Sequence, residues 1–380
     1  MITRKYFNLL KERLGKYPAV ALVGPRQAGK TTLAKSLGGH YFDLEQEADR
    51  VSLDLQWDRS ITSNKLIILD EAQEWPDVFK RVRGAIDHDR KRRGRFLLLG
   101  SVSPALMKHV SESLAGRMAL LELTPFLWSE LSKENKSHLW LYGGYPDGEI
   151  LHRGSYPQWQ QNYMELLAGR DLPNWGLPAK PRLTRRLFKM LAAVHGQMFN
   201  ASQIGKSLDI SYKTVNSYLD YLEGAFLIRR LPSYHVNLKK RLVKSPKIYW
   251  RDSGLLHTLN NVATQEILLN QPWVGDSWEG FIVEQVISGL KLNSKVCETY
   301  FFRSSDGYEI DLVLDFGLEL WAIEIKLTSS PTVSDIERLN KAADLIDADK
   351  RILISRTSRN VDDGNRFSCN LDGFMEHFCR

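Results

Sequence analysis

The sequence predicts a multidomain α/β protein, in which a parallel sheet comes first, helices follow, and a second α/β unit closes the chain. Its 380 residues exceed what one hydrophobic core normally holds, because single cores stop growing near about 250–300 residues. An apolar run at residues 19–23 enters a glycine-containing loop and then a helical pattern, which is typical of a parallel-sheet unit. Near the C-terminus, a helical pattern at residues 272–290 precedes a strand, a hairpin turn and two further strands.

The composition is that of an ordinary soluble globular protein, with 43% hydrophobic and 26% charged residues. No apolar run approaches the roughly 18 residues of a membrane-spanning helix, and the first residues do not resemble a secretory signal. The three cysteines, at positions 297, 369 and 379, form no C-x-x-C pair. This pattern disfavours a disulfide framework and a zinc site, so we expect a protein of the reducing cytoplasm with no membrane partner.

Positive charge is concentrated in the middle of the chain. The chain carries a net charge of +7, whereas residues 180–251 hold fifteen lysines and arginines against three acids, a net charge of +12. Such asymmetry indicates a polyanionic partner.

The loop at residues 24–31 carries the most specific signal. Gly24-x-x-x-x-Gly29-Lys30-Thr31 is the spacing of a phosphate-binding loop, and it lies between a strand and a helix, as that function requires. The glycines allow consecutive N–H groups to turn inward around an anion at a helix N-terminus. We expect Lys30 to contact the β- and γ-phosphates and the Thr31 hydroxyl to bind Mg²⁺. The residues expected to bind the nucleotide are Gly24, Pro25, Arg26, Gln27, Ala28, Gly29, Lys30, Thr31 and Thr32.

The apolar segment at residues 65–71 ends in two adjacent carboxylates, which is the Walker B form. A buried parallel strand is a continuous apolar run, and its C-terminal end faces the ligand crevice. We therefore expect Asp70 to hold Mg²⁺ and Glu71 to act as the general base for the attacking water. A strand that ends in acids is common by itself, so this interpretation depends on the preceding loop.

Three further positions are expected to act on the γ-phosphate. A buried strand at residues 95–100 ends in Ser101, where a phosphate sensor would lie. Arg117 precedes the next strand and is a candidate arginine finger or sensor, with an ordinary surface arginine as the alternative. Arg170 is a second candidate, and its alternative is an ion pair with Asp171 or other acids.

Several segments together resemble the AAA-type ATPases of prokaryotes that carry a C-terminal domain of unknown function. They are Gly-Pro-Arg-Gln-Ala-Gly-Lys-Thr-Thr, Leu-Asp-Glu-Ala-Gln, Leu-Gly-Ser, Leu-Ala-Gly-Arg and Gly-Gly-Tyr-Pro, at residues 24–32, 69–73, 99–101, 114–117 and 143–146. The match runs in order from about residue 15 to 330. The resemblance implies a sheet of five parallel strands, binding of ATP and Mg²⁺, and a homo-oligomer, for which a ring is plausible. Val102 departs from the family pattern, which puts a sensor role of Ser103 in doubt.

The resemblance and the residue patterns together divide the chain into four parts. Residues 1–127 form the P-loop ATPase core, and residues 128–178 resemble the helical lid of the family. Residues 179–256 are expected to form a winged helix-turn-helix, because two short helices joined by a tight turn precede a β element. Residues 257–380 resemble the PD-(D/E)xK nuclease fold.

The second helix of the predicted winged helix, at residues 212–222, presents a polar face. Tyr212, Lys213, Asn216 and Ser217 are expected to face outward, on the part of the helix that enters a major groove. This set contains no arginine, so contacts to phosphate and DNA shape are favoured over base reading. The basic residues Lys239, Lys240 and Arg241 would follow a nucleic-acid backbone. Winged helices of ATPases also bind protein or only complete the lid.

The C-terminal part contains Asp311 followed by Glu324-x-Lys326, which is the D…ExK order of the nuclease fold. The outer two residues of this tripeptide share one face of a strand, because side chains alternate. In active members the acids, here Asp311 and Glu324, hold Mg²⁺ and the lysine activates water. Glu279 or Glu284 could add a carboxylate. The motif is short, and a fold can persist without its chemistry.

Three hypotheses for function follow. The first is a DNA-processing ATPase that remodels or translocates on DNA, with branched DNA as one fitting substrate. The second is an ATP-dependent nuclease that uses Asp311, Glu324 and Lys326. The third is a slow nucleotide-state switch that binds protein partners. DNA-stimulated ATP hydrolysis, metal-dependent cleavage, and the absence of nucleic-acid binding at low salt would favour the three in turn.

Overall fold

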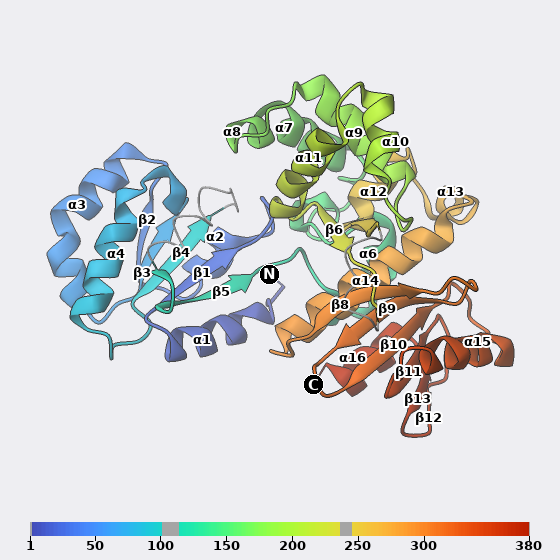
Figure 1. Cartoon of the computed structure of the whole chain (residues 1–380). Coiled ribbons are helices and arrows are strands. Elements are labelled where there is room, and N and C mark those ends of the chain that lie inside the picture. Colours follow the sequence, from blue (N-terminus) through green and yellow to red (C-terminus); the bar gives the residue numbers. More distant parts are fainter. Residues whose placement is uncertain (1, 101–113, 236–244, 380) are drawn as a thin grey trace.

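The computed structural model describes residues 2–100, 114–235 and 245–379. It contains three β-sheets, and helices cover the two larger ones (Figure 1). Ser101, Lys239, Lys240 and Arg241 lie outside the described residues, so the roles given to them above stay predictions. None of the helices within the described ranges is both long and apolar enough to cross a membrane.

The N-terminal sheet has five parallel strands in the order β2-β3-β4-β1-β5. This finding confirms the predicted five-stranded parallel sheet. The strands are β1 (Ala19–Val23), β2 (His40–Asp43), β3 (Ile67–Asp70), β4 (Phe96–Gly100) and β5 (Met118–Glu122). The helices are α1 (Tyr6–Lys16), α2 (Lys30–Lys35), α3 (Glu47–Thr62) and α4 (Asp77–His88).

Alternation along β1 divides the core of this sheet between its two faces. Ala19, Ala21 and Val23 pack with α4 residues such as Phe79, whereas Val20 and Leu22 pack with α1 residues such as Leu10. A strand that is buried on both faces must be apolar throughout, which is why its sequence was readable. Helix α3 was not predicted, because only Leu53 and Ser60 of its residues are buried and it lacks an apolar stripe.

The middle of the chain is helical and is followed by a two-stranded antiparallel sheet. Its helices are α6 (Lys133–Tyr142), α7 (Gln158–Leu166), the π-helical segment Leu167–Asp171, α8 (Leu172–Asn174), α9 (Pro181–Ala193), α10 (Ala201–Leu208) and α11 (Tyr212–Gly224). Strands β6 (Ile228–Leu231) and β7 (Lys247–Trp250) pair antiparallel and are called the hairpin below. Ser211 caps α11 by accepting a hydrogen bond from the N–H of Thr214, as predicted.

Residues 128–178 contribute to two different hydrophobic cores. Helix α7 shares one core with α9, α10 and α11, through residues such as Tyr163, Leu187 and Leu219. Helix α6 packs instead with the C-terminal part, through Leu139, Trp140 and Leu141. The segment therefore joins the helical middle of the chain to the C-terminal sheet.

The C-terminal part is a six-stranded mixed sheet in the order β12-β13-β11-β10-β9-β8. Its strands are β8 (Glu298–Arg303), β9 (Glu309–Asp315), β10 (Leu320–Ile325), β11 (Lys350–Ile354), β12 (Val361–Asp362) and β13 (Arg366–Cys369). The helices of this part are α12 (Ser253–Leu259), α13 (Gln265–Leu269), α14 (Val274–Leu292), α15 (Val333–Asp344) and α16 (Leu371–Phe378). Helices α14 and α16 cover one face and α15 covers the other. The tail after residue 356, which carried no readable signal, supplies β12, β13 and α16.

The hairpin lies between the helical middle and α14 (Figure 1). Ile248 and Trp250 of β7 belong to the core of α9–α11, whereas Tyr249 belongs to the core of the C-terminal part. Beyond β6, the N–H of Tyr234 donates to the carbonyl of Phe301 in β8 at 2.6 Å. The hairpin is thus shared by two parts of the protein, and its alternation aims every second side chain at the C-terminal part.

Candidate functional site

The loop between β1 and α2 has the backbone of an anion-binding turn. Gly24 has φ +151°, and a Cβ there would lie 2.1 Å from the carbonyl oxygen of Leu123, so only glycine fits. Gly29 has φ +94° and Gln27 has φ +62°, and both lie in the left-handed region. The loop therefore curves at the N-terminus of α2, where backbone N–H groups favour negative charge.

Lys30 is buried at the centre of this loop, and its Nζ donates to the carbonyl oxygens of Gly24 and Pro25, both at 3.0 Å. Burial lowers the pKa of Lys30 to about 8, although the charges of Glu71 and Asp70 act in the opposite direction. The ammonium thus lies inside its own loop, with weak compensation for its charge.

Asp70 ends β3 beside the loop. The Thr31 hydroxyl donates to Asp70 Oδ2 at 2.7 Å, and the Tyr41 hydroxyl donates to the same oxygen at 2.8 Å. Tyr41 was not predicted as a site residue. The sequence feature that could have identified Tyr41 is its position on the strand next to β3. Strands β2 and β3 pair in register from His40↔Ile67 to Asp43↔Asp70.

Glu71 follows directly and adopts a left-handed backbone conformation, with φ +46°. Its Oε2 accepts a hydrogen bond from Gln73 Nε2 at 2.5 Å. Burial raises the pKa of Glu71 above its usual range. A carboxylate with a raised pKa is a better proton acceptor near neutral pH.

The donor set at this edge fits a magnesium-bound triphosphate. A hydroxyl and a carboxylate, from Thr31 and Asp70, are the hard oxygen ligands that Mg²⁺ prefers. The Lys30 ammonium and the loop amides lie on the side where phosphate groups would bind, and Gly24 permits the close backbone approach. The predicted residues 24–32, 70 and 71 are therefore brought together, and their roles in binding and hydrolysis are developed below as a proposal.

The segment at residues 128–178 contacts the loop between β1 and α2 through a buried aspartate. Asp171 Oδ1 accepts from Arg26 at 2.8 Å and from Arg170 at 2.9 Å, and only 2% of the Asp171 side chain is exposed. The Tyr163 hydroxyl also donates to the Arg26 carbonyl at 3.2 Å. The ion pair weighed above for Arg170 is therefore present, and it places this arginine beside the phosphate loop.

Arg117 lies far from that loop within the chain. It immediately precedes β5, and Met118 pairs with Ala19 at the start of β1, whereas the loop follows the end of β1. Its guanidinium makes two hydrogen bonds to Asp87, at 2.9 and 3.1 Å. Arg117 thus lies at the end of the sheet where β1 begins, opposite the end that carries the loop. A contact between Arg117 and phosphate would therefore require a neighbouring subunit.

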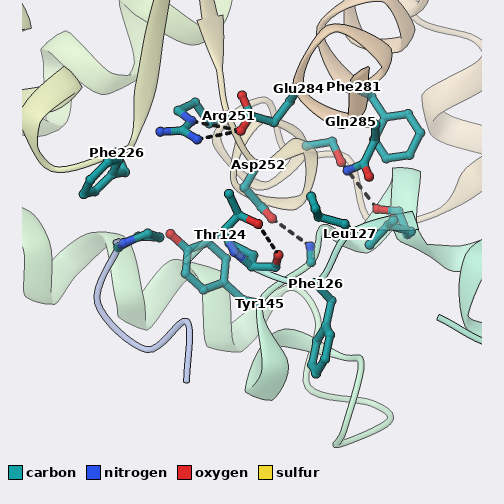
Figure 2. Close-up of a pocket in the computed structure, with 15 residues that line it drawn as sticks. Thr124, Phe126, Leu127, Tyr145, Phe226, Arg251, Asp252, Phe281, Glu284 and Gln285 are labelled. Atoms are coloured by element: carbon teal, nitrogen blue, oxygen red, sulfur yellow. Dashed lines mark hydrogen bonds and ion pairs between the residues drawn. The ribbon is translucent and has the colours of Figure 1, made fainter. Parts of the chain in front are cut away.

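A buried ionic cluster joins the N-terminal sheet to the hairpin and to α14. Arg251, just after β7, bonds Glu122 at the end of β5, and its Nε and terminal nitrogen donate to Glu284 Oε1 at 3.0 and 2.7 Å. Arg229 of β6 donates to the other oxygen of Glu284 at 2.8 and 3.0 Å. Figure 2 shows the guanidinium of Arg251 against the Glu284 carboxylate within the pocket that these elements line.

Asp252 connects this cluster to the Gly-Gly-Tyr-Pro segment at residues 143–146. Its carboxylate accepts from the N–H groups of Gly144 at 2.7 Å and Leu255 at 3.0 Å, which also caps α12. A Cβ on Gly144 would lie 2.5 Å from the Phe126 carbonyl oxygen. These contacts explain the glycine of the motif by close packing at the junction.

A second carboxylate cluster lies in the C-terminal part. Asp311 on β9 accepts from the N–H of Ile325 at 2.8 Å, and Glu324 on β10 pairs with Lys326 at 2.6 Å. Burial raises the pKa of Asp311 to about 7 and that of Glu324 to about 8, and the neighbouring carboxylates add to both shifts. The structure therefore brings together the three predicted residues of the D…ExK pattern.

The two acids weighed on α14 have separate surroundings. Glu279 lies at the second cluster, where it bonds the Lys247 ammonium at 2.9 Å and the Tyr249 hydroxyl at 2.5 Å. Glu284 instead holds Arg229 and Arg251, so it adds no carboxylate to that cluster. Sequence reasoning missed Lys247, which offered only a lone basic residue before a short apolar run.

The positive charge of residues 180–251 is partly internal. Arg229, Lys247 and Arg251 pair with acids of α14 and its surroundings. The remaining basic residues of α9 to α11 and the residue before α9 are exposed. They are Lys180, Arg182, Arg185, Arg186, Lys189, Lys206 and Lys213. The predicted outward residues Tyr212, Lys213, Asn216 and Ser217 are exposed as well, and their contact with nucleic acid stays a prediction.

Comparison with known proteins assigns the class. The family model of the AAA domain matches residues 16–132, and two domains of unknown function, DUF8612 and DUF4143, match residues 133–266 and 274–372. With the parallel sheet and its phosphate loop, these matches support an AAA-type P-loop ATPase domain at residues 16–132, followed in the chain by a C-terminal domain with a mixed sheet.

Two curated mycobacterial proteins show the particular family. The uncharacterized protein Rv2008c of Mycobacterium tuberculosis is 37% identical over 330 residues, which cover 86% of this chain and 74% of that protein. The uncharacterized protein Mb2031c of Mycobacterium bovis matches with the same values. The chain belongs to the same family as these two proteins.

Solved structures show more distant similarity. The Walker-type ATPase PABY2304 of Pyrococcus abyssi is 16% identical, with a TM-score of 0.45, over 68% of this chain and 96% of that chain. RuvB of Thermotoga maritima is 18% identical, with a TM-score of 0.28, over 60% and 88%. ORC1 of Aeropyrum pernix, solved in complex with DNA, is 12% identical, with a TM-score of 0.29, over 67% and 90%. These TM-scores are too low to support an argument about this chain.

Proposed function

We propose that this protein binds and hydrolyses ATP with Mg²⁺ at the edge formed by β1 and β3, and that the cycle moves a DNA-binding region. The observation that carries the proposal is the hydrogen bond of 2.7 Å between the Thr31 hydroxyl and Asp70. It brings the metal-binding residue types of two separate motifs together, beside a buried lysine and a second carboxylate.

Each residue has a role that follows from its position. The loop amides of residues 24–32 and the Lys30 ammonium bind the phosphates, and Thr31 and Asp70 hold the metal ion. Bound Mg²⁺ supplies charge neutralisation at the β- and γ-phosphates. Glu71 accepts the proton of the attacking water, for which its raised pKa is suited.

The lid senses the phosphate loop through Arg26. In the described arrangement Asp171 holds both Arg26 and Arg170. Negative charge on the loop would compete with Asp171 for these two arginines, because both partners are anions. Arg170 is therefore the preferred arginine for contact with phosphate in cis, and Arg117 is the candidate for contact in trans in a homo-oligomer, including a ring.

We propose four functional parts with the boundaries predicted above. Residues 1–127 hydrolyse ATP, residues 128–178 act as the lid, residues 179–256 act as a winged helix-turn-helix, and residues 257–380 form a PD-(D/E)xK-like domain. The order of α9, α10, α11 and the hairpin supports the third part. Asp311 lies on β9, Glu324 lies on the adjacent strand β10, and Lys326 follows directly and pairs with Glu324, which supports the fourth.

Exposed basic residues on α9, α10 and α11 support DNA as the partner. The side chains of Arg182, Lys206 and Lys213 are exposed to solvent, and the neighbouring Tyr212 is 53% exposed. Phosphate contacts from such a surface do not depend on base sequence. Remodelling of DNA, including branched DNA, is the activity that this arrangement favours.

Nuclease activity is the second candidate, since Asp311, Glu324 and Lys326 lie together. The position of Lys247 among neighbouring carboxylates argues against cleavage in this conformation. The third candidate is a nucleotide-state switch that binds protein partners. Slow ATP turnover that DNA does not change would favour it.

Measurement of ATP turnover tests the first proposal. We expect hydrolysis that DNA stimulates, and a loss of about 100-fold or more in the Glu71→Gln variant, because a general base contributes at least that factor. Glu12→Gln is the matched control, because Glu12 is an exposed acid of α1 that forms an ion pair with Lys16. Equal turnover in wild type and Glu71→Gln would contradict the assignment.

Salt dependence of binding to single-stranded, duplex and branched DNA tests the partner. If about six phosphates are neutralised, affinity should fall roughly 1,000-fold between 50 and 200 mM salt. Charge reversal at Lys206 and Lys213 should weaken binding to all DNA sequences alike, whereas Lys80→Glu on α4 should not. An affinity for DNA that does not change with salt concentration would exclude this surface as a DNA-binding site.

A further inference from the structure

A buried arginine near the N-terminus contacts the loop between β1 and α2, which is called the β1–α2 loop below. Arg4 lies before the start of α1, and only 9% of its side chain is exposed. Its Nη1 donates a hydrogen bond to the carbonyl oxygen of Ala28 at 3.0 Å. Sequence reasoning did not name Arg4, because 23 residues of unrelated pattern separate it from the next arginine position considered, Arg26 within the loop.

The rest of the Arg4 guanidinium binds the chain that follows β5. Its Nη2 donates to the carbonyl oxygen of Thr124 at 2.7 Å, and its Nε donates to Glu130 Oε1 at 3.0 Å. The guanidinium carbon also lies 4.5 Å from the centre of the Phe126 ring. Arg4 therefore fastens the β1–α2 loop to the segment that leads from β5 into residues 128–178.

The charge of Arg4 is already balanced within the protein. None of the Glu130 side chain is exposed, and its carboxylate also accepts the N–H groups of Lys5 at 2.9 Å and Leu127 at 3.0 Å. The planar guanidinium thus has a fixed set of acceptors that match its fork of donors. An effect of Arg4 on a bound phosphate must therefore pass through the loop that Arg4 holds.

The Ala28 carbonyl determines where the N–H of Gly29 points. Both groups belong to one planar peptide unit, and in a trans peptide they point in opposite directions. The unit between Ala28 and Gly29 is trans, because the cis peptide bond found within the described residues is that between Tyr156 and Pro157. By holding the Ala28 carbonyl, Arg4 directs the Gly29 N–H away from itself.

Little else holds this peptide unit in place. Of the described residues, only Arg4 donates to the Ala28 carbonyl. Gly29 has φ +94°, and a Cβ built on it would meet no atom within 4 Å, so packing does not prevent rotation. Within the same residues the Gly29 N–H has no hydrogen-bond acceptor. It is one of the loop amides that the proposed function assigns to phosphate.

We propose that Arg4 is a positioning residue of the phosphate site, because it holds the Ala28 carbonyl and so keeps the Gly29 N–H directed toward bound phosphate. This inference rests on the proposed binding of ATP at the β1–α2 loop and deepens it. An amide that is oriented before the ligand arrives does not have to be ordered by the ligand, which raises affinity. Arg4 acts in this way without contact with the nucleotide.

Calorimetric titration of the full-length chain with ATP and with inorganic tripolyphosphate, both with MgCl₂, tests the proposal. The main variant is Arg4→Lys, which keeps a cation beside the buried Glu130 but lacks the guanidinium fork that reaches Ala28 as well. We expect both ligands to bind about tenfold more weakly, because a hydrogen bond to a charged group is lost. A loss for ATP without an equal loss for tripolyphosphate would overturn the proposal.

Arg92→Lys is the matched control. Arg92 also bonds two backbone carbonyls, those of Ile61 at 2.9 Å and of Ser63, but at the C-terminal end of α3. Its substitution perturbs a similar arginine without touching the β1–α2 loop, so both ligands should bind as in the wild type. An equal loss of affinity in Arg92→Lys and Arg4→Lys would show a general effect on the sheet and would overturn the proposal.

Steady-state ATP turnover distinguishes positioning from a general loss of structure. The Gly29 N–H would contact phosphate before and during the reaction, so Arg4→Lys should raise KM about tenfold and leave kcat within about threefold. A fall in kcat at unchanged KM would overturn the proposal. If Arg4→Lys does not fold, Arg4→Gln combined with Glu130→Gln removes the guanidinium without leaving a buried acid unpaired, and it should show the same rise in KM.

The wild-type titration separates this inference from the function on which it rests. Wild-type protein that binds neither ATP nor tripolyphosphate would overturn the proposed function, and this inference with it. Wild-type protein that binds both ligands, together with a folded Arg4→Lys variant of the same affinity, would overturn the role of Arg4 alone.

Discussion

Two sites in this protein place a buried lysine near carboxylates, but the lysine is held differently in each. Lys30 comes from the same loop that it serves, and within the described part of the chain its ammonium bonds only the carbonyl oxygens of Gly24 and Pro25. Lys247 comes from the hairpin and contacts carboxylates of another region, Glu279 and Glu309. Burial lowers the pKa of Lys30, whereas at Lys247 the surrounding carboxylates outweigh burial and raise the pKa.

The difference indicates which charge a ligand must carry to bind at each lysine. Around Lys30 the positive charge is poorly compensated, so an incoming anion would complete the site. Around Lys247 the negative charge is in excess, so an incoming anion would be repelled and an incoming cation would have to compete. The same residue type thus marks a phosphate site in one region and an internal counter-ion in the other.

The largest effect is expected for the stability of Lys247→Met. Removal of one partner from a buried ionic cluster leaves uncompensated charge and typically costs about 3–5 kcal/mol. Lys30→Met should change the free energy of unfolding by only about 1 kcal/mol, because it removes a poorly compensated charge together with two hydrogen bonds. Urea unfolding of both variants measures this contrast, and equal losses at the two positions would break the comparison.

The reverse order is expected for nucleotide affinity. Lys30→Met should weaken binding of ATP and Mg²⁺ by about 100-fold, since charge-assisted contacts to phosphate are lost. Lys247→Met should leave nucleotide affinity within about threefold, provided that measurements are made below its unfolding transition. Titration with a fluorescent ATP analogue distinguishes the two, and a parallel loss in both variants would show that the sites are not separable.

Acid pH should weaken the hairpin region. His195 accepts the N–H of Trp250 in β7 through Nδ1 at 3.0 Å, and burial lowers the pKa of His195 to about 3. Burial also lowers the pKa of His257 to about 4. Because the unfolded chain binds protons at its histidines below about pH 6.5 and the folded chain does not, each histidine should contribute a loss of about 2 kcal/mol of stability between pH 7 and 5. The raised pKa of Asp311 and of Glu324 acts in the opposite direction, because the folded chain takes up those protons first.

Urea unfolding at these two pH values measures the loss. His195→Asn, whose side-chain oxygen can still accept from Trp250, should lose the contribution of His195, so its change in stability between the two pH values should differ from that of the wild type by about 2 kcal/mol. The same change in stability in His195→Asn and in the wild type would show that His195 does not contribute to the pH dependence.

The smallest effect concerns alkaline pH and the nucleotide. Phosphate binding favours the protonated form of Lys30, whose pKa without nucleotide is about 8. Below that pH the ammonium is already present, and above it nucleotide binding must take up a proton, so affinity should fall as pH rises. Between pH 7.5 and 9 we expect a loss of roughly tenfold.

The matched control is Lys30→Arg, because a guanidinium stays charged throughout this range. Its affinity should be weaker but independent of pH. A wild-type affinity that is also constant up to pH 9 would show that the Lys30 ammonium is stabilised in the free protein, which would remove the contrast with Lys247.

Much of the fold was readable because buried parallel strands have no polar face. The apolar runs at β1, β3 and β4 were therefore predicted, and so was their edge with Asp70 and Glu71. Helix α3 and the tail elements β12, β13 and α16 were not predicted. Helix α3 is mostly exposed, and β12 is a strand of two exposed residues, so neither leaves a periodic apolar pattern.

The nucleotide site was predictable for a related reason. Its loop, its lysine and its hydroxyl are consecutive in the chain, so their spacing reports their geometry directly. The contacts that connect it to other parts were not predictable. Arg26 and Asp171 are 145 residues apart, and Tyr41 reaches Asp70 across 29 residues.

By itself, the sequence determined the local features of this protein, because neighbouring residues dictate backbone geometry. These features are the glycine turns, the strand that ends in two acids and the D…ExK spacing. Tertiary structure alone decided which charges meet. It directed Glu284 to two arginines and inserted Lys247 among Glu279 and Glu309. The physical reason is that the energy of a buried charge depends on what packs around it, and those partners come from distant segments.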